Sequence, residues 1–257
     1  MGFHSRVNAD RNVGVPVNDR SDECRITELV QQLQTSPDDL TLLCRLSEIY
    51  ERTNLLPQAL KVCETLLRLA PKNFNFRYHQ ADLLSKLNYA DQALELLVRL
   101  HRESPADLAV INALGRCCYD LGMYDEAARY CQEYLALAPD SPAMRNNDAR
   151  CHVSSGRIEE ACAVLQESLK ATPRDAEAHA LLGVTYALLG RKDDALRERK
   201  FAVESCSDPS TIGELLRELD DLIDADPGTI SPQYAEMITT MLLVWLARAR
   251  RARPPAP

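Results

Sequence analysis

The fold is decided by residues 108–141, which read LAVINALGRCCYDLGMYDEAARYCQEYLALAPDS. The stretch predicts a first helix that carries Leu114, a turn over residues 121–125, and a second helix over residues 126–138. Pro139 follows the second helix. Because proline lacks an N–H and restricts the residue before it, it ends one helix and suits the start of another. The stretch is therefore a helix–turn–helix unit with a proline stop.

The same unit recurs along the chain at an interval of 34 residues. Three kinds of residue keep the interval: a proline, an alanine and a small residue. The prolines are Pro37, Pro71, Pro105, Pro139 and Pro173, the alanines are Ala59, Ala93, Ala127, Ala161 and Ala195, and the small residues are Ser47, Ala81, Gly115, Ala149 and Gly183. Because these three series keep the same interval over five periods, they predict a repeat protein made of helix pairs. The small residues are expected where two helices approach closely, which is a packing role.

These residues resemble the tetratricopeptide repeat family. The resemblance rests on Leu114-Gly115 before the turn, Tyr50 and Tyr186 on first helices, the alanine series on second helices, and the closing prolines. It implies an all-α fold, a right-handed superhelical solenoid of helix–turn–helix repeats with C-terminal capping helices.

The interval also divides the chain into segments. We expect a disordered tail over residues 1–20 and a partial repeat over residues 21–39. Five full repeats are expected at 40–73, 74–107, 108–141, 142–175 and 176–209. Beyond them we expect C-terminal capping helices over 210–253 and a tail over 254–257.

The family pattern weakens in two first helices. Arg77 and Gln80 in the second repeat, and Arg145 and Asp148 in the fourth, stand where large apolar residues are usual. Two interpretations remain open: these helices pack less well than the others, or they present charge to a partner.

Two helices are expected after the last repeat, over residues 210–224 and 232–251. The second has an apolar stripe and a basic end, formed by Tyr234, Ile238, Met241, Leu242, Trp245, Arg248, Arg250 and Arg251. The favoured interpretation is that both helices cap the open end of the repeat array. Self-association through the stripe and docking on an anionic membrane surface are the alternatives.

Composition excludes several classes of function. The formal net charge is -8, which makes general nucleic-acid binding unfavourable, because such binding depends on Lys and Arg neutralising phosphates. The first residues, 1–11, lack the apolar core of a secretory signal, and no run of 18 apolar residues suits a bilayer. We therefore expect a cytoplasmic protein with reduced cysteines.

No motif in the sequence predicts catalysis or a cofactor. The five histidines are scattered, and the sequence has no nucleophile elbow, Gly-rich phosphate loop or zinc-protease motif. The nine cysteines include no C-x-x-C pair, and the favoured interpretation is that they fill small gaps in the core. Metal binding or redox sensing is the alternative. We expect no enzyme activity, no metal and no cofactor.

The resemblance also implies where a partner would bind. In the family, the second, fifth, ninth and twelfth positions of each repeat line a groove, and we call these positions the groove face. Here they include Cys44, Glu48, Tyr78, Asp82, Asn112, Arg116, Tyr119, Asn146, Arg150, Ala180, Val184 and Ala187, with Asn147 adjacent.

Two pairs on this face repeat in register. Asn112 and Asn146 are one period apart, and so are Arg116 and Arg150. An Asn side chain can donate to and accept from a peptide backbone, and an Arg guanidinium can pair with a carboxylate through two hydrogen bonds. The pairs predict a ladder that holds an extended peptide or an acidic segment.

The sequence thus predicts a non-catalytic protein-interaction module, acting as an adaptor, an assembly factor or a chaperone-like protein. The alternative is a self-assembling or membrane-associated scaffold that acts through its C-terminal helix. A protein or peptide partner is expected, membrane binding is not favoured, and the oligomeric state is left open.

Overall fold

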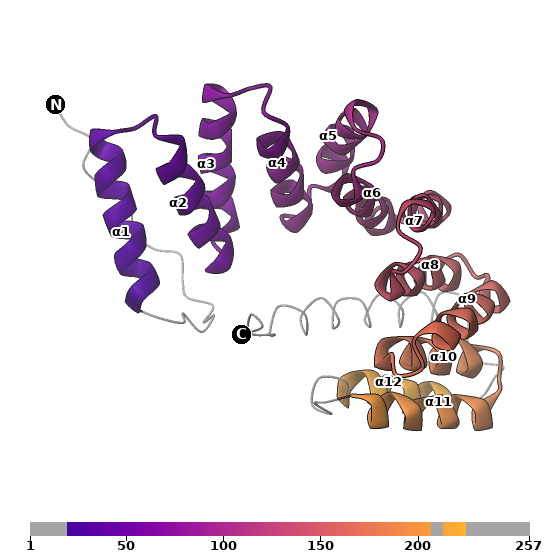
Figure 1. The fold of residues 1–257 in the computed structure, drawn as a ribbon. Helices are drawn as coiled ribbons and strands as arrows, with labels where there is room; N and C mark the ends of the chain where they lie inside the picture. The colour runs from indigo at the N-terminus through magenta and orange to yellow at the C-terminus, as the bar shows by residue number, and fades with distance from the viewer. Residues whose placement is uncertain (1–19, 207–212, 225–257) are drawn as a thin grey trace. The chain divides into compact units, whose positions relative to one another are not determined.

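The structure is a computed structural model that describes residues 20–206 and 213–224, and within these residues it contains α-helices and no strand (Figure 1). The helices are α1 (Arg20–Thr35), α2 (Leu40–Arg52), α3 (Leu56–Leu69), α4 (Phe74–Lys86), α5 (Ala90–Glu103), α6 (Leu108–Asp120), α7 (Tyr124–Leu137), α8 (Pro142–Ser154), α9 (Ile158–Ala171), α10 (Ala176–Leu188), α11 (Lys192–Ser205) and α12 (Gly213–Asp224). The predicted all-α fold is confirmed.

The chain divides into two compact units, which are described separately. The first, within residues 1–87, contains α1 to α4, and the second, within residues 88–257, contains α5 to α12. In each unit every helix packs against the next one along the chain. This order of contacts is that of stacked helix pairs. The boundary falls between α4 and α5, inside the interval expected for the second repeat.

Each first helix begins at a capping residue. Asp107, for example, accepts hydrogen bonds from the N–H groups of Ala109 and Val110 at 2.9 and 3.1 Å. Such a cap satisfies donors that have no partner inside the helix. The caps are Asp39, Asn73, Asp107, Ser141 and Asp175. They keep the interval of 34 residues, a fourth series that the sequence analysis missed.

The turn inside each pair depends on one residue with positive φ. These residues are Asn54, Asn88, Gly122, Gly156 and Gly190, with φ between 59° and 80°. Gly and Asn tolerate this left-handed conformation best. At Gly122 it closes α6, because the N–H of Met123 donates to the carbonyl of Cys118 at 2.8 Å. The turn is therefore shorter than predicted, and α7 begins at Tyr124 rather than at residue 126.

The small-residue series have the predicted packing role. All five alanines of the second helices have no exposed area. At Gly183 a Cβ atom would lie 3.0 Å from Cδ2 of Leu219 and 3.5 Å from the carbonyl oxygen of Ala195. These neighbours belong to α12 and α11, so the glycine lets both helices approach α10 closely.

The two weak first helices have different surroundings. In α4, Arg77 and Gln80 are half-buried, and Arg77 donates to the carbonyl of Lys72 at 3.4 Å. In α8, Asp148 is buried and lies 3.6 Å from Nε2 of His152. Burial raises the pKa of Asp148. The charge of Asp148 is therefore directed toward its own helix, whereas Arg145 is half-buried and donates to the carbonyl of Pro139.

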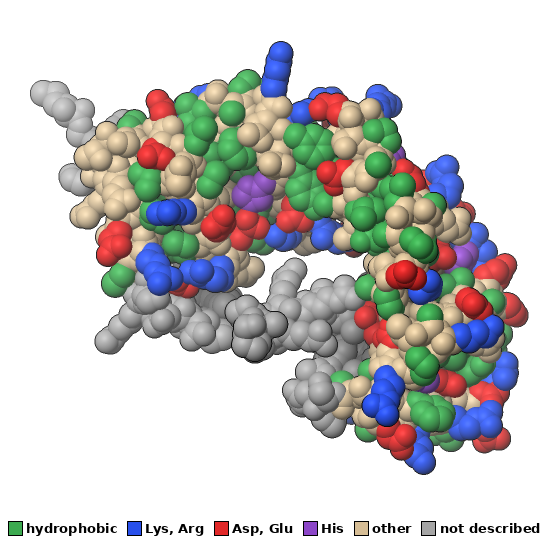
Figure 2. Space-filling model, viewed as in Figure 1, with side chains coloured by type: hydrophobic (Ala, Val, Ile, Leu, Met, Phe, Trp, Pro, Cys, Tyr) green, Lys and Arg blue, Asp and Glu red, His purple; other side chains and the backbone are tan. Residues whose placement is uncertain are grey.

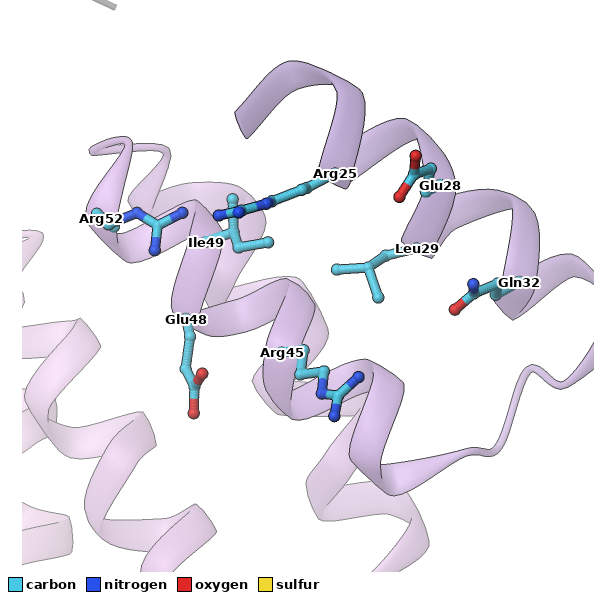
Figure 3. Close-up of a pocket in the computed structure, with 8 residues that line it drawn as sticks. All are labelled: Arg25, Glu28, Leu29, Gln32, Arg45, Glu48, Ile49 and Arg52. Carbon is cyan, nitrogen blue, oxygen red and sulfur yellow. The ribbon is translucent and has the colours of Figure 1, made fainter. Parts of the chain in front are cut away.

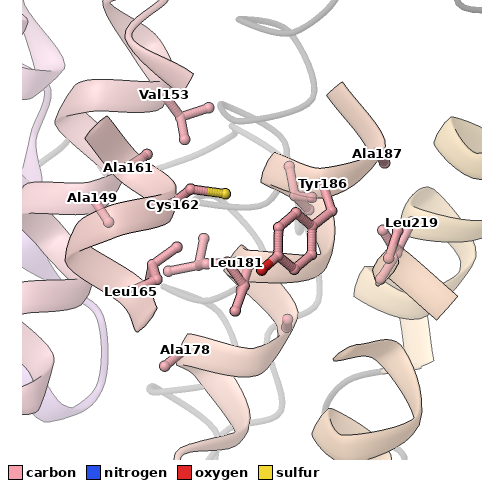
Figure 4. Packing of buried hydrophobic residues seen from close by; sticks show 14 of the residues in the cluster. Ala149, Val153, Ala161, Cys162, Leu165, Ala178, Leu181, Tyr186, Ala187 and Leu219 are labelled. Carbon is pink, nitrogen blue, oxygen red and sulfur yellow. The ribbon is translucent and has the colours of Figure 1, made fainter. Parts of the chain in front are cut away.

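A buried hydrophobic cluster of the second unit extends from α8 to α12 (Figure 4). Leu165 of α9 and Leu181 of α10 belong to it, and α12 contributes Leu219, Leu222 and Ile223. The helix expected over residues 210–224 is observed from Gly213 to Asp224 and packs against α10 and α11. The helix expected over residues 232–251 lies outside the described residues.

His179 of α10 is held between two acceptors. Its Nδ1 lies 2.6 Å from Oε2 of Glu198, and its Nε2 lies 3.1 Å from the carbonyl oxygen of Pro173. Its ring stacks on Phe201 with centroids 5.3 Å apart. Two acceptors suit an imidazolium, which donates from both nitrogens. Burial alone lowers the pKa of His179, but the bonds to Glu198 and Pro173 outweigh it, and the net shift is upward.

This geometry predicts a pH-dependent stability. Because the folded pKa of His179 is raised, the stabilisation is fully present below about pH 6.5, the ordinary His value. It is lost as the pH rises through the folded pKa. We expect urea unfolding to show this decline in the wild type and a weaker one in His179→Gln. An equal decline in both proteins would assign the pH dependence to other groups.

Candidate functional site

In the first unit, the predicted groove residues Tyr78 and Asp82 lie half-buried on α4. Asp82 pairs with Lys86 at 2.6 Å, and Lys86 also pairs with Glu51 at 2.7 Å. Glu51 in turn lies 2.5 Å from Nε2 of His79. The hydrogen bond from His79, with help from Lys86, lowers the pKa of Glu51 despite its burial. These groups form one mutually paired charge network that links α2 to α4.

An open pocket of about 280 Å³ lies between α1 and α2 of the same unit (Figure 3). Leu29 and Ile49 are its buried apolar residues. Its charged and polar residues are Arg25, Glu28, Gln32, Arg45, Glu48 and Arg52. No sequence motif marks this pocket, although the spacing of Arg45, Glu48 and Arg52 places them on one helical face. Acidic and basic residues are mixed there, so the lining does not select a charged ligand of one sign.

In the second unit, α6 presents the first rung of the predicted ladder. Asn112 and Arg116 are both exposed and lie one helical turn apart. Tyr119 is half-buried, and its hydroxyl lies 2.6 Å from Oγ of Ser154 on α8. Burial raises the pKa of Tyr119. α6 therefore offers an amide and a guanidinium at the surface, and Tyr119 ties α6 to the next repeat.

The second rung, on α8, differs from the first. Asn146 is 1% exposed, and its Nδ2 donates to Oδ2 of Asp175 at 3.1 Å. The side chain of Arg150 is 6% exposed, lies 3.4 Å from Oε1 of Glu177, and donates to Oδ1 of Asn147. The two pairs of the predicted ladder therefore differ: the pair on α6 is exposed, whereas the pair on α8 is buried and bonded to other side chains. The physical reason is that Asp175 and Glu177, at the start of the next repeat, supply acceptors to α8.

One buried polar atom of Asn146 has no hydrogen-bond partner within the part of the chain that the structure describes. Oδ1 of Asn146 is buried and accepts no hydrogen bond from the described residues. A buried acceptor without a donor costs free energy, so this atom suits a donor from a ligand or another segment. The groove-face positions of α10 are apolar and buried: Ala180, Val184 and Ala187 are 0, 2 and 3% exposed.

The described residues contain no group of His, Cys, Asp and Glu that could hold a metal. All nine cysteines are free. Burial raises the pKa of Cys63 to about 12 and that of Cys118 to about 11. Thiols with such pKa values stay protonated near neutral pH and are poor nucleophiles. Buried, protonated thiols fit a packing role.

Charge on the visible surface is mixed. Figure 2 shows acidic and basic side chains interspersed over the face in view. Among the described helices, none is long and apolar enough to cross a membrane. The predicted membrane or self-association residues lie outside the described part of the chain; they are Tyr234, Ile238, Met241, Trp245, Arg248, Arg250 and Arg251.

Comparison with known sequences identifies the repeat. A family model described as tetratricopeptide repeat matches residues 88–151 and 120–184. The TPR repeat-containing protein PA4667 of Pseudomonas aeruginosa is 30% identical over 112 residues, which cover 42% of this chain. The match spans only 18% of that protein, so this chain is similar to a small part of it.

Solved structures share the fold. A tetratricopeptide repeat protein from Parabacteroides merdae is 19% identical, with a TM-score of 0.67, over 90% of this chain and 86% of that one. YrrB, described as a TPR protein with an unusual peptide-binding site, is 18% identical with a TM-score of 0.55, over 75% of this chain and 97% of its own. MamA is 16% identical with a TM-score of 0.56, over 68% of this chain and 93% of its own. At these identities the likeness shows the fold alone.

Proposed function

This chain is a tetratricopeptide-repeat protein, and from that premise we propose that it binds an extended peptide or an acidic segment on the groove face of α6 and α8. Proteins of the family generally act as non-catalytic scaffolds that bind protein or peptide partners. Within that class, the proposal assigns this chain the role of an adaptor, an assembly factor or a chaperone-like protein in the cytoplasm.

The observation that carries the proposal is the exposed pair on α6. Asn112 and Arg116 stand one turn apart at the surface, at groove-face positions. The amide of Asn112 can exchange hydrogen bonds with a peptide backbone. The guanidinium of Arg116 can bind a carboxylate with two parallel bonds. A peptide with an acidic side chain or a terminal carboxylate matches this pair.

Residues of α8 support peptide binding at the pair on α6 in two ways. The contact between Tyr119 and Ser154 joins α6 to α8, so the rungs are held in register. The acceptor Oδ1 of Asn146 offers a place for a backbone N–H of the peptide. The likeness to YrrB adds support, because the peptide-binding site described for that protein lies on the same fold.

We predict that an Asn112→Ala/Arg116→Ala variant loses partner capture from the native cell lysate. Hydrogen bonds to a charged group contribute about 1.5–3 kcal/mol, so affinity should fall about 10-fold to 100-fold. Both residues are exposed, and circular dichroism should be unchanged. The readout is affinity purification followed by titration of the captured partner.

The matched control is Arg129→Ala. Arg129 is an exposed arginine of α7 that pairs with Glu126 of its own helix at 3.3 Å. This variant should capture the partner like the wild type. Equal capture by the double variant and the control would refute the proposal and move the search to the other faces of the repeats.

A further inference from the structure

The groove face of the second unit changes from exposed to buried along the chain. At the fifth position of successive repeats stand Asn112, which is exposed, and then Asn146 and Ala180, which are 1% and 0% exposed. The ninth position follows the same course, from exposed Arg116 to Arg150 and Val184, which are 5% and 2% exposed. The same repeat positions are thus open on α6 and covered on α8 and α10.

The composition of α10 agrees with this burial. Its sequence, AEAHALLGVTYAL, has apolar residues all round the helix, and such a helix is normally buried on every side. Its other sides meet the repeat stack: Thr185 contacts Cys162 of α9 at 3.3 Å, and Gly183 faces Leu219 of α12. Ala180 and Val184 lie one turn apart on a different side from both. This side is as fully covered as the others, so an apolar group lies against it.

We propose that the occupant is the chain's own C-terminal segment, residues 232–253. Tyr234, Ile238, Met241 and Trp245 are spaced by four, three and four residues, which places them on one face of a helix. A helix that lies in a groove uses this pattern of anchors. Ala180 and Val184 have small, apolar side chains, which suit close contact with bulky apolar ones. The tyrosine hydroxyl and the indole N–H also supply donors for Oδ1 of Asn146.

The C-terminal segment is joined covalently to α12, which favours this segment over a second molecule as the occupant. The segment follows α12, which ends at Asp224 and packs directly against α10. Residues 225–231 connect the two, and seven extended residues reach up to about 25 Å, more than the diameter of a helix. A tethered segment has an effective concentration in the millimolar range. A free copy of the chain would have to compete with it.

The docking goes beyond the proposed function and does not require it. It makes the segment a built-in competitor for the groove face of α8, beside the pair on α6. A partner that extends along α8 would then have to displace it.

The fluorescence of Trp245 can report whether the C-terminal segment is docked, because Trp245 is the single tryptophan. In the full-length protein we expect Trp245 to emit at the shorter wavelength of a buried indole and to be protected from acrylamide, independently of protein concentration. Met241→Glu, on the stripe, should move the emission to that of an exposed indole and abolish the protection. Thr240→Glu, on the opposite side of the same expected helix, should change neither.

Two further variants test the receiving face. Ala187→Glu lies in the last turn of α10, and Val184→Glu lies near its centre. Each should expose Trp245 while circular dichroism stays that of the wild type. If either variant unfolds, the pair of segment variants still decides the question, since they leave α10 unchanged.

Several results would overturn the proposal. Trp245 that is exposed in the wild type shows that the segment is undocked. Protection that depends on concentration, with dimers in sedimentation, assigns the stripe to a second copy. Protection that appears only with vesicles of phosphatidylserine and phosphatidylcholine assigns it to a membrane. Protection that survives folded Ala187→Glu and Val184→Glu places the segment elsewhere on the repeats.

Discussion

Leu165→Ala is expected to lower the free energy of unfolding of the second unit by about 3 kcal/mol. Leu165 has no exposed area and lies in the cluster that joins α8 to α12. The substitution removes two buried methyl groups and a CH group and leaves a cavity, because stacked helices are closely packed and collapse only in part. Urea unfolding followed by circular dichroism measures the loss.

The matched control is Leu137→Ala. Leu137 also lies on a second helix, but 50% of its surface is exposed. Its truncation should change the stability by less than about 0.5 kcal/mol. A similar, small effect at both positions would mean that the α8 to α12 cluster does not hold the second unit together.

The sequence predicted the fold well because its strongest signals are local. A proline stop and a small residue at a helix crossing act on their nearest neighbours, so their period alone locates the helix pairs. The caps, such as Asp107, and the left-handed turn residues, such as Gly122, keep the same period. They could have been found from the sequence and would have placed the start of α7 correctly.

The site was harder to predict because burial is not local. Asn112 and Asn146 occupy the same repeat position, and so do Arg116 and Arg150, yet only the first member of each pair is exposed. The buried pair also has partners in the following repeat. After α6 comes a repeat that begins at Ser141, whereas after α8 comes one whose Asp175 meets Asn146.

A sequence signal for this difference did exist. Glu177 stands at the second position of its repeat, where the two preceding repeats have Ala109 and Ala143. An acidic residue there provides a partner for the arginine of the preceding first helix. Comparing the same position in successive repeats does not reveal such a contact, because the contact joins different positions of neighbouring repeats.

The role of Arg150 is therefore expected to be structural, and its replacement by alanine should lower the free energy of unfolding. Its side chain is 6% exposed and that of Glu177 is 20% exposed, with 3.4 Å between the charged groups. Removing one partner of a buried ion pair leaves the other charge desolvated. We expect Arg150→Ala to destabilise the second unit by about 2–3 kcal/mol, below the full range for a buried pair because Glu177 keeps some contact with water. Urea unfolding gives this value directly.

Arg116→Ala is the control that the repeat itself provides, because Arg116 occupies the same position one period earlier and is exposed. It should change stability by less than about 0.5 kcal/mol while weakening partner binding. The double variant Arg150→Met/Glu177→Leu should recover most of the stability lost in Arg150→Ala, because two apolar side chains leave no desolvated charge. If Arg150→Ala were instead as stable as Arg116→Ala, the contact with Glu177 would be weak. Arg150 would then be available to a peptide, and two equivalent pairs would describe the site better than one.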